Sequence, residues 1–494
     1  MSDNCKHKQE NRRRSATRPS KLLFRESRSR VTQRTIRTFP IHNQSGSRVP
    51  IFNTGGETSM IQFKQHMYGP SLNSSLKALF LIYLISFPYI FYYPFVQDAS
   101  DTVRGYSDKR FQKVVEVFSS NFASGYEREG AALTIYHRGK QVVNIWGGYA
   151  DRSAGRKWTA NTITPVFSAT KAIASLVIAV LVDRGVLKYE DRVVKYWPEY
   201  GANGKENTTI EDVLTHKAGI PYLKEQILIE DIQSGQILNK VASATPLWEP
   251  GTASGYHPVT FGLILDGILM NVDPKGRNVA QFFKEEIAEV HGIDAHIGFA
   301  GDHKRVAKVT TPMFWEFVRD MIKDPRIILM LGIIHGRPDD MVRKLTWSTP
   351  WFQADWNNVT LNDPSILSLP LSAVTGTTSA SELARLFSMM LSSKLISNLT
   401  LSQIVEPTLN SWHLEQVTLW PVIKGHGFFY EPHPFISGVY TFGHPGWGGH
   451  FIHVDPWTET VITYVSNGLK TGSGELCAPY MSIYREVYSI LSSV

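Results

Sequence analysis

The chain has 494 residues, 43% of them hydrophobic and 19% charged, a composition typical of a globular protein with one large domain or two. Its formal net charge of +7 arises in residues 1–77, where 15 Lys and Arg residues stand against 4 Asp and Glu residues, whereas the rest of the chain has 36 against 40. Because the main body carries no excess of positive charge, we expect no nucleic-acid partner.

The N-terminal segment, residues 1–75, is rich in Arg, Ser, Thr and Gln and shows no hydrophobic periodicity. Such a composition cannot bury enough apolar surface to offset the entropy that is lost when a chain becomes ordered. We therefore predict that this basic segment is disordered.

An uncharged apolar run follows at residues 78–97, with the sequence ALFLIYLISFPYIFYYPFVQ. About 20 such residues can span a bilayer as a helix, so we predict a transmembrane signal anchor at 76–98 and a membrane as a partner. The Lys and Arg excess before the run predicts a cytoplasmic N-terminus and places the rest of the chain on the lumenal or extracellular side. Two alternatives stay open, a buried core helix and a mitochondrial transit segment.

Residues 105–494 are interpreted as one domain that begins and ends with strands. Two alternating runs, joined by HRGK, predict a β-hairpin near its start. Apolar periodicity and capping residues predict helices in between, at 168–182, 209–216, 225–245, 261–270 and 379–390. Three strands and a helix close the chain, at 438–443, 451–454, 461–466 and 478–494. This order predicts an α/β (α+β) fold, with one antiparallel sheet built from both ends of the domain and an all-helical insertion.

The stretch at 285–370 has no clear pattern. It includes the apolar segment IILMLGII at 327–334, which is too short to span a membrane. We expect this segment to be buried in the core. The alternative is that it lines a substrate groove or touches a bilayer.

A serine and a lysine stand three residues apart at Ser168 and Lys171, at the start of a small and apolar run. At this spacing both side chains lie on one face of a helix, and burial would keep the lysine amine neutral, so that it could take the serine proton. The Ser-x-x-Lys pattern alone occurs by chance about once or twice in a chain of this length. A second match at Ser74 and Lys77 lies outside any amphipathic pattern and is interpreted as such a coincidence.

Three further motifs follow Ser168 and Lys171 in order: LTHKAGI at 214–220, PGTASGY at 250–256 and GHPGWGG at 443–449. Together the four motifs resemble those of the serine β-lactamase and penicillin-binding-protein superfamily, of which Ser-x-x-Lys is one signature. The resemblance is closest to the branch related to class C β-lactamases, which includes carboxylesterases and the animal β-lactamase-like proteins. It extends from about residue 110 to the C-terminus.

The resemblance implies a role for each matching residue. Ser168 would be the acylated nucleophile and Lys171 its proton acceptor, while Tyr256 matches the tyrosine that carries the proton to the leaving group and activates water. The backbone N–H groups of Ser168 and Trp447 would form the oxyanion hole. Two residues would contact the substrate opposite the serine: His444 and Gly446.

Three other histidines are not assigned to the chemistry. His216 lies in a turn motif that is structural in relatives, and we expect the same here. His450 and His453 flank a predicted strand and are interpreted as ordinary polar positions.

Two departures from the superfamily pattern bear on the substrate. The second motif reads Tyr256-His257-Pro258, so a substrate-amide contact that relatives make at the third position is absent. The third motif, usually Lys-Thr-Gly, reads HPG at 444–446, which removes the lysine that helps to bind a β-lactam carboxylate. A literal KTG at 470–472 follows the last strand and is interpreted as unrelated. We therefore predict a serine hydrolase that acts on small-molecule or peptide acyl substrates, an esterase or peptidase more than an antibiotic β-lactamase.

Other enzyme classes lack their signatures here. The chain has no Gly-x-Ser-x-Gly elbow and no His-Glu-x-x-His cluster, and its two cysteines, Cys5 and Cys477, give neither a disulfide framework nor a metal site. We expect no cofactor and no metal. The alternative function is a catalytically weak, membrane-associated scaffold that self-assembles, and an oligomer is possible in either case.

Overall fold

The computed structural model describes residues 77, 81 and 83 and the ranges 103–353, 358–409 and 415–493. The chain divides into two compact units, 1–71 and 72–494, and every described residue belongs to the second. The segment predicted to be disordered, 1–75, lies outside the described residues. That segment and the domain boundary at 105 therefore stay predictions.

The predicted transmembrane anchor is not supported. Across the described ranges, no helix has the length and apolar character that a membrane span requires. Of the run at 78–97 only Leu81 and Tyr83 are described, both in helical conformation, and the remainder lies outside the described residues. The prediction of a membrane location, with a cytoplasmic N-terminus and a lumenal or extracellular domain, is therefore corrected, and neither a membrane nor a mitochondrial location is carried forward.

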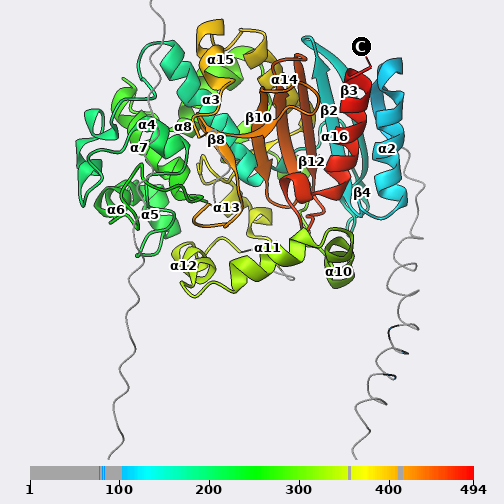
Figure 1. Cartoon of the computed structure of the whole chain (residues 1–494), viewed down its shortest axis with the longest axis horizontal. Coiled ribbons are helices and arrows are strands. Elements are labelled where there is room, and N and C mark those ends of the chain that lie inside the picture. Colours follow the sequence, from blue (N-terminus) through cyan, green and yellow to red (C-terminus); the bar gives the residue numbers. More distant parts are fainter. Residues whose placement is uncertain are drawn as a thin grey trace, which may run out of the picture. The chain divides into compact units, whose positions relative to one another are not determined.

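A nine-stranded antiparallel sheet forms the centre of the described structure, in the order β1-β3-β2-β12-β11-β10-β9-β8, with β4 paired to β3 (Figure 1). Inside the sheet, β2 from the start of the domain pairs with β12 from its end, with Leu133 opposite Tyr464. The sheet predicted from both ends of the domain is thus confirmed. Its strands are β1 (Arg104–Ser107), β2 (Gly130–His137), β3 (Lys140–Asp151), β4 (Arg156–Lys157), β8 (Ile423–Gly425), β9 (Phe428–Pro432), β10 (Tyr440–Gly446), β11 (His450–Asp455) and β12 (Thr460–Ser466).

Both faces of this sheet are covered by helices, because its central strands are apolar on both sides. On β12, Ile462 and Tyr464 pack with α2 (Gln112–Ala123) and α16 (Ala478–Leu491). The intervening Val461 and Val465 belong to the larger core on the opposite face, where α14 (Ala380–Leu391) contacts β2 and β12. Alternate side chains of a strand point to opposite faces, so a strand covered on both sides has apolar residues on both faces.

The predicted helical insertion occupies the middle of the chain. It surrounds α3 (Thr170–Asp183), in which every residue from Thr170 to Leu181 is buried. A three-stranded sheet lies beside it, in the order β5 (Thr164–Pro165), β7 (Gly376–Thr378) and β6 (Ala295–Ile297). The remaining helices of this part are α4 (Ile210–Leu214), α5 (Ile229–Ser234), α6 (Ile237–Ser243), α7 (Thr260–Val272), α8 (Val279–Phe282), α9 (Glu289–His291), α13 (Pro364–Leu367) and α15 (Asn398–Ile404).

Three helices, α10 (Phe314–Lys323), α11 (Arg326–His335) and α12 (Met341–Ser348), lie along one edge of the domain, below the sheet in Figure 1. The prediction that the apolar segment at 327–334 is buried in the core is wrong, because Ile327 is the only residue of α11 that is buried. Ile328 and Leu329 are more than half exposed. We call residues 314–348 the cap.

The orientation of α3 directs its first turn toward the cap. At its C-terminal end, the Asp183 carboxylate accepts hydrogen bonds from Ser397 Oγ at 2.5 Å and Thr400 Oγ at 2.7 Å, where α15 begins. The N-terminal end of α3 therefore points away from α15, toward the edge where the cap lies (Figure 1). Ser168 is found at that end.

Candidate active site

A sharp turn presents Ser168 at the start of α3. The residue before it, Phe167, has a φ of +50°, which bulky side chains rarely adopt. Phe167 is held there by burial, since its ring contacts the rings of Trp447 and His450, each with centroids 5.5 Å apart. Strained backbone of this kind persists only where its surroundings fix it, and it is common at active sites.

Lys171 lies one helical turn further and is completely buried. Its Nζ atom is 3.4 Å from Ser168 Oγ, 2.8 Å from the carbonyl oxygen of Pro258 and 3.0 Å from that of Ala373. Burial lowers the pKa of Lys171 well below its usual range, which favours the neutral amine. A neutral amine has two N–H donors, which the two carbonyl groups take up, and one lone pair, which is left for the proton of Ser168.

Tyr256 is the third residue of the cluster. Its side chain is hydrogen-bonded to that of Ser168, and Lys171 Nζ lies 4.8 Å from the centre of its ring. Burial raises the pKa of Tyr256. The three residues predicted to be catalytic, Ser168, Lys171 and Tyr256, are therefore brought together, with the Ser168 hydroxyl in contact with both of the other side chains.

Two histidines of the predicted turn motifs support Tyr256. The ring of His216 lies 4.8 Å from the Tyr256 ring, and its Nδ1 atom accepts a hydrogen bond from the backbone N–H of His257 at 3.1 Å. His257 in turn donates from Nδ1 to the carbonyl of Gly255 and accepts at Nε2 from the N–H of Ile220. Burial lowers the pKa of His257 to about 3, so both rings serve as neutral hydrogen-bonding groups.

A buried ion pair that the sequence analysis missed lies behind Tyr256. The backbone N–H of Tyr256 donates to the Glu415 carboxylate, which is 3.8 Å from Lys424 Nζ. Lys424 also donates to Ser254 Oγ at 2.8 Å. Burial lowers the pKa of Lys424 to about 8, while the charge of Glu415 opposes that shift. A lysine within the otherwise apolar strand β8 is the one sequence signal that could have indicated this pair.

Strand β10 lines the opposite side of the cluster. The ring of His444 lies 6.3 Å from that of Tyr256 and 4.5 Å from that of Phe429. Its Nδ1 atom donates to the carbonyl of Pro445 at 2.7 Å, and its buried Nε2 atom has no hydrogen-bond partner in the described structure. Burial lowers the pKa of His444 to about 3. His444 is therefore neutral and presents a hydrogen-bond acceptor, not a cation.

Trp447 follows β10 directly and is 38% exposed at the rim of the cluster, where it touches Phe167. The structure thus places Trp447 beside the turn that carries Ser168. The oxyanion role of the two backbone N–H groups, and the substrate-binding roles of His444 and Gly446, stay predictions.

The other residues singled out from the sequence lie in the interior of the domain. His450 and His453 are not ordinary polar positions, because both lie in β11 and are almost completely buried, with His453 hydrogen-bonded to Tyr488 at 2.7 Å. Lys470 of the KTG sequence pairs with Glu127 at 2.9 Å and donates to Ser466 Oγ at 2.7 Å. Within the described ranges, no three His, Cys, Asp or Glu side chains form a group that could hold a metal ion.

Comparison with known proteins places this fold and this cluster in one family. A family model described as Beta-lactamase matches residues 108–485. The chain therefore belongs to the beta-lactamase family. The predicted superfamily is confirmed.

Two curated relatives carry names that include an esterase. The chain is 38% identical over 221 residues to the Esterase/beta-lactamase LipL of Mycobacterium tuberculosis. The matched region covers 44% of this chain and 50% of LipL. It is 30% identical over 145 residues to Esterase EstB of Burkholderia gladioli. That matched region covers 26% of this chain and 37% of EstB. The matches thus span about half or less of the length of these relatives.

Solved structures extend the similarity to the whole domain. A family VIII carboxylesterase is 25% identical, with a TM-score of 0.68 over 79% of this chain and 100% of that structure. A penicillin-binding-protein homologue from Caulobacter crescentus is 28% identical, with a TM-score of 0.64 over the same shares. The predicted fold is confirmed, and the predicted class of enzyme, a serine hydrolase, agrees with these relatives.

Proposed function

We propose that this protein is a serine hydrolase that cleaves carboxylic esters through an acyl-enzyme on Ser168. The observation that carries the proposal is the environment of Lys171, a buried lysine whose Nζ atom lies within hydrogen-bonding distance of Ser168 Oγ and of two backbone carbonyl oxygens. This arrangement supports a buried neutral amine as the base that activates the serine. The carboxylesterase and esterase names among the relatives support the choice of substrate.

The reaction proceeds in two halves. Ser168 Oγ attacks the ester carbonyl carbon as its proton moves to Lys171, and the backbone N–H groups of Ser168 and Trp447 hold the charge that develops on the carbonyl oxygen. The bond to the alcohol oxygen then breaks, and that oxygen takes a proton from Tyr256, which is reprotonated from Lys171. Water then attacks the acyl-enzyme and gives a proton to Tyr256 as Tyr256 passes its own proton to Lys171. The bond from the acyl carbon to Ser168 Oγ breaks, the proton returns along the same path to Ser168, and the acid is released.

The neutral state of His444 supports an ester over a β-lactam. A lysine in the third motif would offer a positive charge to the carboxylate of a β-lactam. His444 instead offers an uncharged acceptor atom, which repels a carboxylate oxygen and gives no ionic attraction. We therefore expect short-chain esters to be hydrolysed faster than a chromogenic cephalosporin by the same preparation.

The full-length protein should be incubated with a fluorophosphonate and, separately, with a chromogenic short-chain ester. We expect one adduct, located on Ser168, and ester turnover that Ser168→Ala abolishes without loss of the folded state. Ser74→Ala is the matched control, since it removes the serine of the second Ser-x-x-Lys sequence and should leave both readouts unchanged. A folded protein that forms no adduct would reject the hydrolase and favour the self-assembling scaffold.

A further inference from the structure

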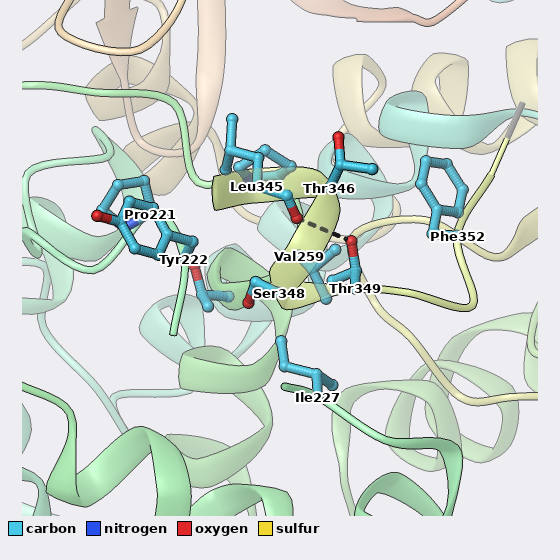
Figure 2. A pocket seen from close by; sticks show the side chains of 11 residues that line it. Pro221, Tyr222, Ile227, Val259, Leu345, Thr346, Ser348, Thr349 and Phe352 are labelled. Carbon is cyan, nitrogen blue, oxygen red and sulfur yellow. Dashed lines mark hydrogen bonds between the residues drawn. The ribbon is translucent and has the colours of Figure 1, made fainter. Parts of the chain in front are cut away.

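A cavity of about 180 Å³ lies between the helical part of the domain and the cap (Figure 2). One wall comes from the segments that follow LTHKAGI (214–220) and PGTASGY (250–256), and the other from α12 and the residues after it. The two walls include Pro221, Tyr222, Pro258, Leu345, Thr349 and Phe352.

The cavity shares a wall with the candidate active site. Pro258 lines the cavity, and its carbonyl oxygen accepts the 2.8 Å hydrogen bond from Lys171 Nζ. Lys171 Nζ is in turn 3.4 Å from Ser168 Oγ. Pro258 thus contacts both the cavity and the lysine amine that adjoins the nucleophile, which places the cavity next to the candidate active site.

The lining is mostly apolar, and its three threonine hydroxyl groups donate to backbone carbonyl oxygens. Thr260 Oγ donates to the carbonyl of Ile220 at 2.7 Å, and Thr349 Oγ to that of Leu345 at 3.2 Å (Figure 2). Thr346 Oγ donates to the carbonyl of Val342, and Ser348 Oγ accepts from the N–H of Leu223. Tyr222 carries the fifth hydroxyl group of the lining. Most of the remaining lining is hydrocarbon, from Pro221, Ile227, Pro258, Val259, Leu345 and Phe352, so a hydrocarbon group can enter with little loss of polar contacts.

The cap is fastened to both sides of the candidate active site. At the start of α11, Arg326 pairs with Glu475 at 3.5 Å. Glu475 lies in the segment after β12, and a backbone N–H of the turn at Trp447 donates a hydrogen bond to the same segment. Beyond the end of α11, Arg337 donates to the carbonyl oxygens of Gln416 and Val417, at 2.6 and 2.8 Å. These two residues follow Glu415 directly, whose carboxylate accepts the N–H of Tyr256. The position of α12 over the cavity is thus tied to the loop that holds Tyr256.

We propose that this cavity binds an apolar hydrocarbon group of the ester substrate, with the cap selecting its size; the proposal rests on the ester-hydrolase function above. A cavity of about 150 Å³ in another protein accepts benzene, and complete drug-sized ligands need about 300 Å³ or more. The measured volume therefore suits one ring or one short chain, and not the whole of a larger substrate.

The test compares two series of esters on the full-length protein. In the first series the phenol is constant and the acyl group grows from acetyl through butyryl to hexanoyl. In the second the acyl group is acetyl and the alcohol grows in the same steps. For the wild type we expect kcat/KM to rise at least about tenfold along one of the two series, because each methylene group that enters an apolar pocket favours the longer substrate.

Leu345→Trp fills the cavity from α12. We expect it to remove that rise, with kcat/KM for the acetyl ester of the short alcohol within about twofold of the wild type. Trp347→Leu is the matched control, since Trp347 lies on the same helix, is 50% exposed and does not line the cavity. If Leu345→Trp unfolds, Leu345→Ala takes its place, and the optimum should move to a longer chain.

The outcomes separate the two proposals. A response to Leu345→Trp in the first series assigns the cavity to the acyl group, and one in the second series assigns it to the alcohol. If the wild type and both Leu345 variants show the same chain-length profile in both series, the cavity does not bind substrate, although ester hydrolysis stands. If the folded wild type cleaves no ester of either series, the proposed function itself is wrong.

Discussion

Gly446 of β10 lies so close to Val166 that a Cβ atom at Gly446 would come within 2.4 Å of the Val166 carbonyl oxygen. Val166 is two residues before Ser168, so strand β10 and the serine turn touch at backbone level. Side chains do not tolerate a contact this short, and we predict that Gly446→Ala displaces β10 from the turn. A shift of about 1 Å in an active site can cost about 100-fold in rate, and we expect kcat/KM for a short ester to fall at least about tenfold.

Gly332→Ala is the control for this substitution. Gly332 lies in α11, and a Cβ atom added there meets no other atom within 4 Å. We expect an unchanged kcat/KM and an equal or higher melting temperature, because alanine favours a helix over glycine. Full activity in Gly446→Ala would show that the contact with Val166 does not set the geometry of the site.

The protonation state of Lys171 should control the rate. Only the neutral amine can accept the Ser168 proton, so we expect kcat/KM to fall as the pH is lowered through the pKa of Lys171. Burial lowers that pKa well below its usual range, so the fall should begin far below pH 10.5, the ordinary value for a lysine. The pH profile of kcat/KM for an ester without ionisable groups measures this directly.

Substitution of Lys171 tests the same base without a change of pH. Lys171→Met removes the amine, and Lys171→Arg replaces it with a guanidinium group that stays protonated and has no lone pair to offer. Both variants should lose about 100- to 10,000-fold in kcat/KM, as expected for the loss of a general base. A near-normal rate in either folded variant would reject the role of Lys171.

The hydroxyl of Tyr256 is predicted to carry a proton, and Tyr256→Phe removes it while the ring and its packing against His216 remain. We expect kcat/KM to fall about 100-fold or more, with little change in melting temperature. Tyr189→Phe is the matched control, because the Tyr189 hydroxyl is buried and has no hydrogen-bond partner in the described structure. An equal loss of activity in both variants would mean that Tyr256 does not act through its hydroxyl.

The pairing of Ser168 with Lys171 could be predicted from the sequence, because both residues belong to one helical segment and helix geometry sets the distance between them. Ser168 and Lys171 are three residues apart, and the apolar run after them indicated the burial that neutralises the lysine. The carbonyl groups that orient Lys171 gave no such signal. Pro258 and Ala373 are distant in sequence and act through their backbones, which any residue type supplies.

The fold, like the site, has features that the sequence predicts and features that it does not. Alternating and apolar runs predicted strands at both ends of the domain, and the pairing of β2 with β12 confirmed a single sheet. The apolar segment of α11 indicated a core helix, but its environment depends on what packs against it, and most of it lies at the surface. Hydropathy alone cannot separate these two cases, since a buried helix and an apolar surface helix have the same composition.

The buried carboxylate of Glu211, in the first turn of α4, provides a test of stability that is independent of catalysis. Its Oε1 atom accepts hydrogen bonds from the Thr408 hydroxyl and from the N–H of His426, but its buried Oε2 atom has no partner in the described structure. Burial raises the pKa of Glu211 to about 7. The pKa of the same group in the unfolded chain is about 4.3.

Between these two pKa values the folded protein binds more protons at Glu211 than the unfolded chain, so the free energy of unfolding decreases as the pH rises. Glu211→Gln keeps the acceptor oxygen and removes the charge. We expect it to stabilise the protein by roughly 1–3 kcal/mol more at pH 8 than at pH 5, measured by urea unfolding. Glu225→Gln, at an exposed position, should show no such difference. An equal effect of Glu211→Gln at both pH values would contradict the raised pKa, because the wild-type carboxyl group would then carry the same charge at each.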